Sequence, residues 1–331
     1  MIEIDGSYGE GGGQILRTAV ALSAIIKEDV TIKNIRRNRQ KEGLKPQHLK
    51  SIETIAMMCD ADIKGLFPGS TQIYLSPSEI KGVKANISIG TAGSIPLLIQ
   101  SIMPIAAYSP ERTSLRITGG NDVAWSPSID YMKEVTLKAL SKIGCRASIR
   151  LIERGYYPKG GGAVEIEIDP SRIKGVDFKR EKNEIYGISH CSNLPEHVAK
   201  RQADSAKKVL EENGMEAHIS SKAENYLSTG SGITLWSGLI GSVNIGKKGL
   251  PSEKVGSQAA QMLLDELLSR EAVDTHLADQ LIPYMGLAGS GSFTTRKLTP
   301  HCLTNIHVTE QFLGVHFKIT EINGLTEISV E

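Results

Sequence analysis

The sequence predicts a mixed α/β (α+β) fold in which three βαβαββ repeats form a large domain and a smaller α/β domain is inserted into the third repeat. The order strand, helix, strand, helix, strand, strand occurs at about residues 1–80 and again at 81–170. Most of the same order occurs a third time near the C-terminus, after a stretch with a pattern of its own. We therefore expect a large domain at 1–181 and 273–331 and an inserted domain at 182–272.

The composition is that of a globular protein with room for one large core or two to three domains. The chain has 331 residues, of which 40% are hydrophobic and 23% charged. The first residues are acidic where a signal peptide would be basic, and the apolar stretch 93–108 is too short and interrupted to span a membrane. The four cysteines form no CxxC pair, which argues against a zinc knuckle or a disulfide framework. We expect a cytoplasmic protein without a membrane span.

Hydrophobic spacing defines the elements of the first repeat. Ile15, Ala19 and Leu22 recur at helical spacing after a short β-prone run, and Pro46 suits the first turn of a second helix. The expected strands are 2–5, 30–35, 61–64 and 72–75, and the expected helices are 14–26 and 46–59.

The second repeat follows the same order. Met132, Val135 and Ala139 share one face of a helix that begins at Ser126. Pro104 predicts a kink in the preceding helix, at 94–107. The expected strands are 85–89, 114–118, 146–152 and 163–168, and the expected helices are 94–107 and 126–143.

The third repeat is split by the insertion, so residues 171–181 belong with 273–331. After the insertion we expect helices at 276–286 and 304–313 and strands at 292–296, 315–320 and 325–330. Within the insertion we expect strands near 185–191, 216–220 and 232–237 and helices at 195–212 and 257–268. The first helix of the insertion is highly charged, and its spacing does not decide between a binding surface and a dimer contact.

A glycine-rich loop at residues 6–14 lies between the first expected strand and helix. Bare backbone N–H groups and the helix N-terminus can hold an anion there, although glycine also marks ordinary tight turns. The loop has neither the Gly-Lys-Ser/Thr of a Walker A loop nor the Rossmann spacing. Glu10 lies inside the loop, where it can bind a divalent cation, and Arg17 follows in the first turns of the helix. These two residues favour a phosphate-binding role.

Basic residues cluster between positions 33 and 50, where seven Lys or Arg face the single acid Glu42. The formal net charge of the chain is only +1, so contact with nucleic acid depends on such a local cluster. Guanidinium groups suit phosphate, and mixed Arg, Asn and Gln donors suit a polynucleotide end. A solvated loop is the usual alternative. We favour binding because the run follows a strand at the edge where the glycine-rich loop opens.

Weaker patterns accompany these two loops. Residues 91–94 repeat the strand-glycine-helix arrangement and are followed by Gln100. Residues 154–159 form a compact basic and aromatic patch. The glycine-rich turns 119–122 and 159–162 are either connective or functional.

Two histidine motifs lie in the third repeat. His276 and Asp279 are three residues apart and share a helix face, where they either contact a nucleotide or metal or cap the helix. His301 lies between a strand-like run and a short helix. Its neutral imidazole is a candidate nucleophile, and an ordinary polar loop residue is the alternative.

Taken in order, these motifs resemble those of the RNA 3′-terminal phosphate cyclase family, nearly end to end and including the insertion. The matching stretches are Asp5-Gly6-x-x-Gly9-Glu10-Gly11-Gly12-Gly13-Gln14-Ile15-Leu16-Arg17, Arg36-x-x-Arg39, Gly43-Leu44-x-x-Gln47-His48, His276-Leu277-Ala278-Asp279-Gln280 and His301-Cys302-Leu303-Thr304-Asn305-Ile306. The resemblance implies ATP-dependent conversion of an RNA 3′-phosphate end to a 2′,3′-cyclic phosphate. It further implies a histidine-AMP intermediate, an RNA-adenylate, and release of PPi and AMP.

The resemblance also assigns roles by position. His301 is the residue expected to carry AMP, and Glu10 is expected to hold a divalent metal, Mg or Mn. The residues expected to bind ATP are Arg17, Gln100, His276, Leu277, Ala278, Asp279 and Gln280. The residues expected to bind the RNA 3′-phosphate end are Arg36, Arg39, Gln47 and His48.

Two other classes of function remain open at this stage. A non-catalytic relative that acts in ribosomal-RNA processing or assembly would share the fold but lack the nucleophilic histidine, so His301 argues against it. A carboxyvinyl transferase would share the repeats but bind a small phosphorylated substrate in place of RNA. A homodimer is compatible with the sequence, which does not determine the oligomeric state.

Overall fold

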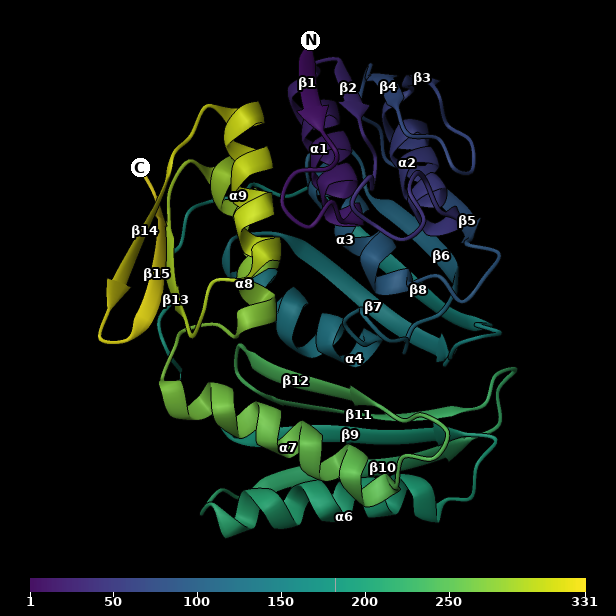
Figure 1. Cartoon of the computed structure of the whole chain (residues 1–331), viewed down its shortest axis with the longest axis vertical. Helices are drawn as coiled ribbons and strands as arrows, with labels where there is room; N and C mark the ends of the chain where they lie inside the picture. The colour runs from purple at the N-terminus through teal and green to yellow at the C-terminus, as the bar shows by residue number, and fades with distance from the viewer. Residues whose placement is uncertain (182) are drawn as a thin grey trace.

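The computed structural model describes residues 1–181 and 183–331 and confirms the mixed α/β fold class. Its strands form four small sheets, and helices lie between and beside them (Figure 1). In the described residues, none of the helices is long and apolar enough to cross a membrane.

The first two sheets have the same strand order. In each sheet the first two strands pair in parallel, and the next two pairings across the sheet are antiparallel. The third strand in sequence lies at the edge. The first sheet consists of β1 (Ile2–Asp5), β2 (Val30–Lys33), β4 (Ile73–Ser76) and β3 (Asp62–Lys64). The second consists of β5 (Lys84–Ser88), β6 (Thr113–Gly119), β8 (Gly162–Asp169) and β7 (Arg146–Glu153).

The third sheet contains three strands in the order β13 (Ser292–Thr295), β15 (Leu325–Val330) and β14 (Phe317–Ile322). An isolated parallel bridge joins Asp177 to Ser292 of β13. In the first two sheets, the strands that correspond to β13 are β2 and β6, and each has a full parallel strand beside it, β1 and β5. This bridge therefore lies where the first strand of a repeat would be expected.

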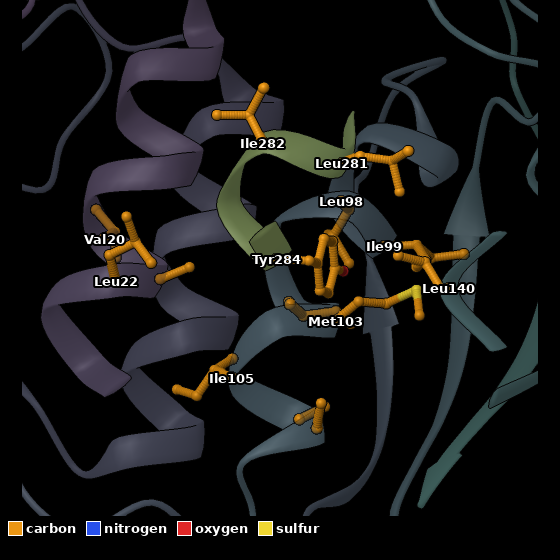
Figure 2. Packing of buried hydrophobic residues seen from close by; sticks show 14 of the residues in the cluster. Val20, Leu22, Leu98, Ile99, Met103, Ile105, Leu140, Leu281, Ile282 and Tyr284 are labelled. Carbon is orange, nitrogen blue, oxygen red and sulfur yellow. The ribbon is translucent and has the colours of Figure 1, made fainter. Parts of the chain in front are cut away.

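Helices from all three predicted repeats share one core. The helices are α1 (Gly13–Ile26), α2 (Pro46–Cys59), α3 (Ile95–Ala107), α8 (Thr275–Ala288) and α9 (Pro300–Leu313). Figure 2 shows Leu98 and Met103 of α3 close to Tyr284 of α8, and Val20 of α1 belongs to the same buried cluster. Each fully buried side chain of this kind stabilises the fold by about 1.5–3 kcal/mol. This shared core fixes how the ends of the helices lie relative to one another.

The insertion builds a fourth sheet with its own hydrophobic cluster, which includes Ile185, Leu210, Ile233 and Leu263. Its elements are β9 (Ile185–Ser192), α6 (His197–Glu212), β10 (Ala217–Glu224), β11 (Gly230–Ser237), β12 (Ile240–Ile245) and α7 (Ser252–Ser269). Helices α6 and α7 pack together against this sheet, and the short α4 (Ile129–Tyr131) contacts β11 and β12 (Figure 1). The division into two domains at the predicted boundaries stays a prediction.

Several predicted boundaries were wrong. The strand expected at 30–35 ends at Lys33 because Asn34 and Arg36 adopt positive φ, which a strand does not accommodate. Strand β12 was missed, and it follows β11 through a hairpin turn at Gly238, whose φ is +64°. The helix expected at 126–143 consists of α4, a π-helical segment η1 (Met132–Thr136) and α5 (Leu137–Lys142).

Candidate active site

Four helix N-termini converge at one end of the helices that share the main core. These are the first turns of α1, α2, α3 and α9, none of which contains an acidic residue. The first N–H groups of a helix have no partner within the helix, and the helix dipole is positive at this end. Several such ends together form a site for anions such as phosphate groups.

Contacts between first-turn residues hold the ends of α1, α2 and α9 together. Gln14 of α1 donates from Nε2 to the backbone oxygen of His301 in α9 at 3.2 Å. A Cβ atom on Gly13 would lie only 2.4 Å from Nε2 of His48 in α2. The position therefore requires glycine, and the imidazole of His48 lies directly against the start of α1.

The other two connections involve loops. The side-chain oxygen of Gln47 in α2 accepts a hydrogen bond from the backbone N–H of Ser94, the N-cap of α3, at 3.3 Å. Asn38 in the basic loop donates to the backbone oxygen of Ser7 in the glycine-rich loop at 2.8 Å. The two loops predicted to bind phosphate are thus joined beside the converging helix ends.

His301 lies in the first turn of α9, and the expectation that the helix would start at residue 304 was wrong. Thr299 is the N-cap, and its side chain accepts a hydrogen bond from the backbone N–H of Cys302 at 2.9 Å. Pro300 occupies the first helical position, where its missing N–H costs nothing. The side chain of His301 is 48% exposed, so the imidazole is fixed at its base and open to an incoming ligand.

The imidazole of His301 lies next to Glu10. Its Nε2 is 3.5 Å from Oε2 of Glu10, which is longer than a normal N–H···O hydrogen bond. The same carboxylate oxygen is 3.2 Å from a guanidinium nitrogen of Arg39. Burial lowers the pKa of His301, and the Glu10 carboxylate only partly opposes that shift. His301 is therefore neutral at pH 7, with Nε2 available as a nucleophile.

Arg17 of α1 and Asp279 of α8 carry opposite charges that affect each other's ionisation. Burial lowers the pKa of Arg17 to about 10, against the effect of the Asp279 charge. Burial raises the pKa of Asp279 to about 7, against the effect of Arg17. Arg17 remains a cation at neutral pH, and a Cβ on Gly13 would lie 3.2 Å from one of its guanidinium nitrogens. The cation thus lies at the start of α1.

His48 is a buried, neutral imidazole with a defined tautomer. Its Nδ1 accepts a hydrogen bond from the backbone N–H of Lys45 at 3.2 Å, so Nε2 carries the hydrogen. Burial and the nearby charges of Arg17, Arg36 and Lys45 lower its pKa to about 3. His48 can therefore donate one hydrogen bond to an anion at the site without carrying charge.

Arg36 is held in place by its own loop. Its side chain donates to the backbone oxygen of Gly43 at 3.3 Å, and the residue is only 8% exposed. Its φ of +58° is unusual for a residue other than glycine. A strained, buried cation beside Arg39 and Lys45 adds to the positive potential of the site.

The structure does not bring every predicted ATP-binding side chain to this place. Leu277 and Ala278 are buried in the core, so only their backbone is available to a ligand. The amide of Gln280 donates to the backbone oxygen of His276 at 2.9 Å and accepts from Thr136 of η1 at 3.0 Å. His276 is exposed at the start of α8, and Gln100 is partly buried on α3. The role of each of these residues stays a prediction.

Sequence reasoning gave no role to Asn305, which joins three helices at the site. Its side-chain oxygen accepts from Thr18 of α1 at 2.9 Å, and its Nδ2 donates to the backbone oxygen of Asp279 in α8 at 2.8 Å. Asn305 is four residues after His301 and so lies on the same face of α9. This spacing is the signal that would have identified it.

An aromatic stack also lies beside the glycine-rich loop. The rings of Tyr8 and His307 are 3.7 Å apart and nearly parallel. A Cβ on Gly9 would lie 2.9 Å from the hydroxyl of Thr304, so the loop fits closely against α9. The stack and this close contact join the glycine-rich loop to α9, the helix that carries His301.

Two groups of side chains were considered as metal sites. Glu10 is a single, half-exposed carboxylate, which suits a Mg²⁺ ion that takes its remaining ligands from substrate phosphates and water. In the described residues, Asp122, Asp130 and His190 also lie close enough together to share an ion. Arg154 already donates to both carboxylates, at 2.9 and 2.7 Å. The second group is therefore a buried ion-pair network, whereas Glu10, which pairs with Arg39 but is half-exposed, stays the predicted metal ligand.

Comparisons with known proteins identify one family. A family model described as RNA 3′-terminal phosphate cyclase matches residues 8–319. A Methanococcoides burtonii protein named RNA 3′-terminal phosphate cyclase is 56% identical over 331 residues and is covered, like this chain, to 100%. A protein of the same name from Archaeoglobus fulgidus is 47% identical over 325 residues, with 98% of each chain covered.

Proposed function

This chain belongs to the RNA 3′-terminal phosphate cyclase family, and from that premise we propose that it uses ATP to close RNA 3′-phosphate ends through an AMP group carried on His301. Family membership identifies it as an enzyme that acts on RNA 3′-phosphate ends. The use of ATP, the histidine intermediate and the roles of individual residues are our proposal.

One observation carries the proposal. His301 presents a neutral, partly exposed Nε2 at the place where four helix N-termini converge, with Arg17, Arg39 and Glu10 around it. In the first step Nε2 attacks the α-phosphorus of ATP, the new N–P bond forms, and the bond to pyrophosphate breaks. The helix ends and the two arginines stabilise the negative charge that moves onto the leaving group.

The next two steps transfer AMP and close the ring. An oxygen of the RNA 3′-phosphate attacks the phosphorus on His301, and the N–P bond breaks to give an RNA-adenylate. The neighbouring 2′-hydroxyl then attacks the 3′-phosphorus, AMP leaves, and the hydroxyl proton passes to solvent. Activation is needed because a phosphate monoester has no leaving group that a 2′-hydroxyl can displace readily. A DNA end lacks the attacking hydroxyl.

The remaining residues bind and orient phosphates. Arg36 and Arg39 offer guanidinium forks to the RNA 3′-phosphate, and neutral His48 adds one donor from Nε2. Gln47, in the first turn of α2, lies near them and bonds to the N-cap of α3. Glu10 would hold a divalent metal such as Mg²⁺ or Mn²⁺, which supplies charge neutralisation on the triphosphate. The predicted ATP ligands Gln100, His276 and Asp279 remain part of this proposal.

Labelling with AMP tests the nucleophile. Incubation with α-labelled ATP and a divalent metal should give wild type that carries acid-labile, alkali-stable label on a denaturing gel. His301→Ala should carry none. His316→Ala is the matched control, because His316 is 75% exposed beyond the opposite end of α9 and should label like wild type.

The proposed intermediate is wrong if His301→Ala binds ATP and still cyclises RNA ends. Wild type that binds ATP without becoming labelled would instead favour a non-catalytic RNA factor. A carboxyvinyl transferase would act on a small phosphorylated substrate without dependence on an RNA end, and family membership argues against it. Cytoplasmic location and a homodimer stay predictions.

A further inference from the structure

Trp125 is the most exposed large hydrophobic side chain in the described residues. It is 99% exposed, and its φ of +65° is rare for a bulky residue. An indole that contacts nothing contributes nothing to the core, and strained backbone of this kind is concentrated at ligand-binding positions. The geometry therefore presents the ring to a partner from outside the chain.

The loop that carries Trp125 is bonded to the RNA-end side of the candidate site. The hydroxyl of Ser126 forms a hydrogen bond with the hydroxyl of Ser94, the N-cap of α3. The backbone N–H of Ser94 in turn donates to Gln47, one of the residues assigned to the RNA end. Trp125 therefore directly precedes Ser126, which is linked to Gln47 through two hydrogen bonds of Ser94.

The basic and aromatic patch at 154–159, which the proposed reaction does not use, joins the same structure. The backbone N–H of Asn121 donates to the oxygen of Gly155 at 3.0 Å, and a Cβ on Gly160 would lie 3.0 Å from Cα of Ala92. Tyr157 on this loop is 77% exposed. We call the three joined loops, residues 91–94, 119–126 and 154–161, the aromatic ledge.

We propose that Trp125 on the aromatic ledge stacks against a nucleobase of the RNA strand upstream of the 3′-phosphate end, which makes the enzyme select a polynucleotide over a lone phosphate ester. This inference rests on the proposed function. Proteins that bind single strands combine a basic surface along the phosphates with aromatic side chains under the bases. Here the basic loop leads directly into α2, and Gln47 in the first turn of that helix is bonded to Ser94 of the aromatic ledge. Base stacking is sequence-tolerant, so the ledge should accept any base.

Steady-state cyclisation of a 3′-phosphorylated RNA oligonucleotide tests the ledge. Trp125→Ala should raise KM for the oligonucleotide by about tenfold, the size of one base–aromatic stack, and leave AMP labelling of His301 unchanged. Oligonucleotides with one abasic position near the 3′ end should show the same loss with wild type, and no further loss with Trp125→Ala. Tyr108→Ala is the control, because Tyr108 is 39% exposed at the opposite end of α3.

A binding measurement keeps the inference independent of catalysis. The chain has two tryptophans, Trp125 and Trp236, so Trp236→Phe leaves Trp125 as the sole indole. Its fluorescence should be quenched by the single-stranded oligonucleotide and less by one that is abasic at the stacking position. Quenching without any cyclisation by wild type would overturn the proposed function and leave the ledge intact.

Three results would overturn the ledge. The first is an unchanged KM in Trp125→Ala together with no quenching by RNA. The second is weakened AMP labelling in Trp125→Ala, which would place the indole at the ATP site. The third is concentration-dependent self-association of wild type that Trp125→Ala abolishes, which would make the ring a contact between two copies of the chain.

Discussion

Two histidines of the site are both neutral, and the structure uses them differently. His301 leaves Nε2 exposed and unbonded beside Glu10, which suits a nucleophile. His48 is 6% exposed and has its Nδ1 committed to the backbone of Lys45, which suits a fixed donor. The same residue type thus suits two different roles because burial and hydrogen bonding differ.

The buried state of His48 predicts a loss of stability in acid. Its pKa is about 3 in the folded protein and near 6.5 when unfolded. Between these values the unfolded chain binds a proton that the folded chain does not, so the free energy of unfolding falls as pH falls. Between pH 6.5 and 4, the free energy of unfolding of His48→Gln should fall by roughly 3 kcal/mol less than that of wild type. Urea denaturation at a series of pH values measures this difference.

The comparison needs a surface histidine as its control. His197 is exposed at the start of α6, and His197→Gln should keep the pH dependence of wild type. His190 is also buried with a lowered pKa, but it is present in all three proteins and cancels. Equal slopes for wild type and His48→Gln would show that His48 is protonated in the folded state.

At the scale of elements, the geometry of the candidate site depends on where helices begin. The start of α9 is set by Thr299 and Pro300, a side-chain cap followed by a residue whose φ already suits a helix. The start of α1 is set by glycines that leave room for His48 and Arg17. A change at either start alters the geometry of the site without touching the reacting atom.

Thr299→Ala should therefore lower both stability and activity. Loss of the cap costs about 1 kcal/mol of folding free energy and loosens the turn that holds His301. Denaturant unfolding should show the lowered midpoint, and single-turnover AMP labelling should be slower than in wild type. Thr299→Ser keeps the hydroxyl acceptor and should behave like wild type in both assays. Identical midpoints for the alanine and serine variants would contradict a capping role.

At the scale of the whole molecule, a buried network joins the inserted sheet to the rest. Arg154 pairs with Asp122 and Asp130, and His190 of β9 lies 3.6 Å from Asp122. The hydroxyl of Tyr156 and Nδ1 of His190 are 2.6 Å apart. Burial acts to lower the pKa of Arg154, but the two carboxylates outweigh it and raise that pKa.

Removing the Arg154 cation from this network should strongly destabilise the protein. Arg154→Met leaves two buried carboxylates without their partner and should lower the free energy of unfolding by roughly 3–5 kcal/mol. Arg150 provides the matched control, since it pairs with Glu165 while its side chain is 70% exposed. Arg150→Ala should cost less than about 1 kcal/mol. Thermal and denaturant unfolding of both variants measures the contrast, and equal losses would refute the structural role of the network.

Local patterns in the sequence predicted the fold class and most of the helices and strands, and they identified the motifs whose chemistry is proposed. The spacing of apolar residues within a short segment indicates a helix or a strand, so α1, α2 and α3 could be predicted from the sequence alone. Boundaries failed where positive φ or a cap decided them, as at Asn34 and Thr299. The motif that contains His301 was identified, but the helical turn that holds it was not.

Only the tertiary structure decided which of these motifs meet. Gln14 and His301 are 287 positions apart in the chain, and their hydrogen bond exists because α1 and α9 pack on the same core. The link from Ser126, the neighbour of Trp125, through Ser94 to Gln47 is likewise absent from any local pattern. Residue type and short-range spacing are written in the sequence, whereas distances between remote residues follow from burial of apolar surface across the whole chain.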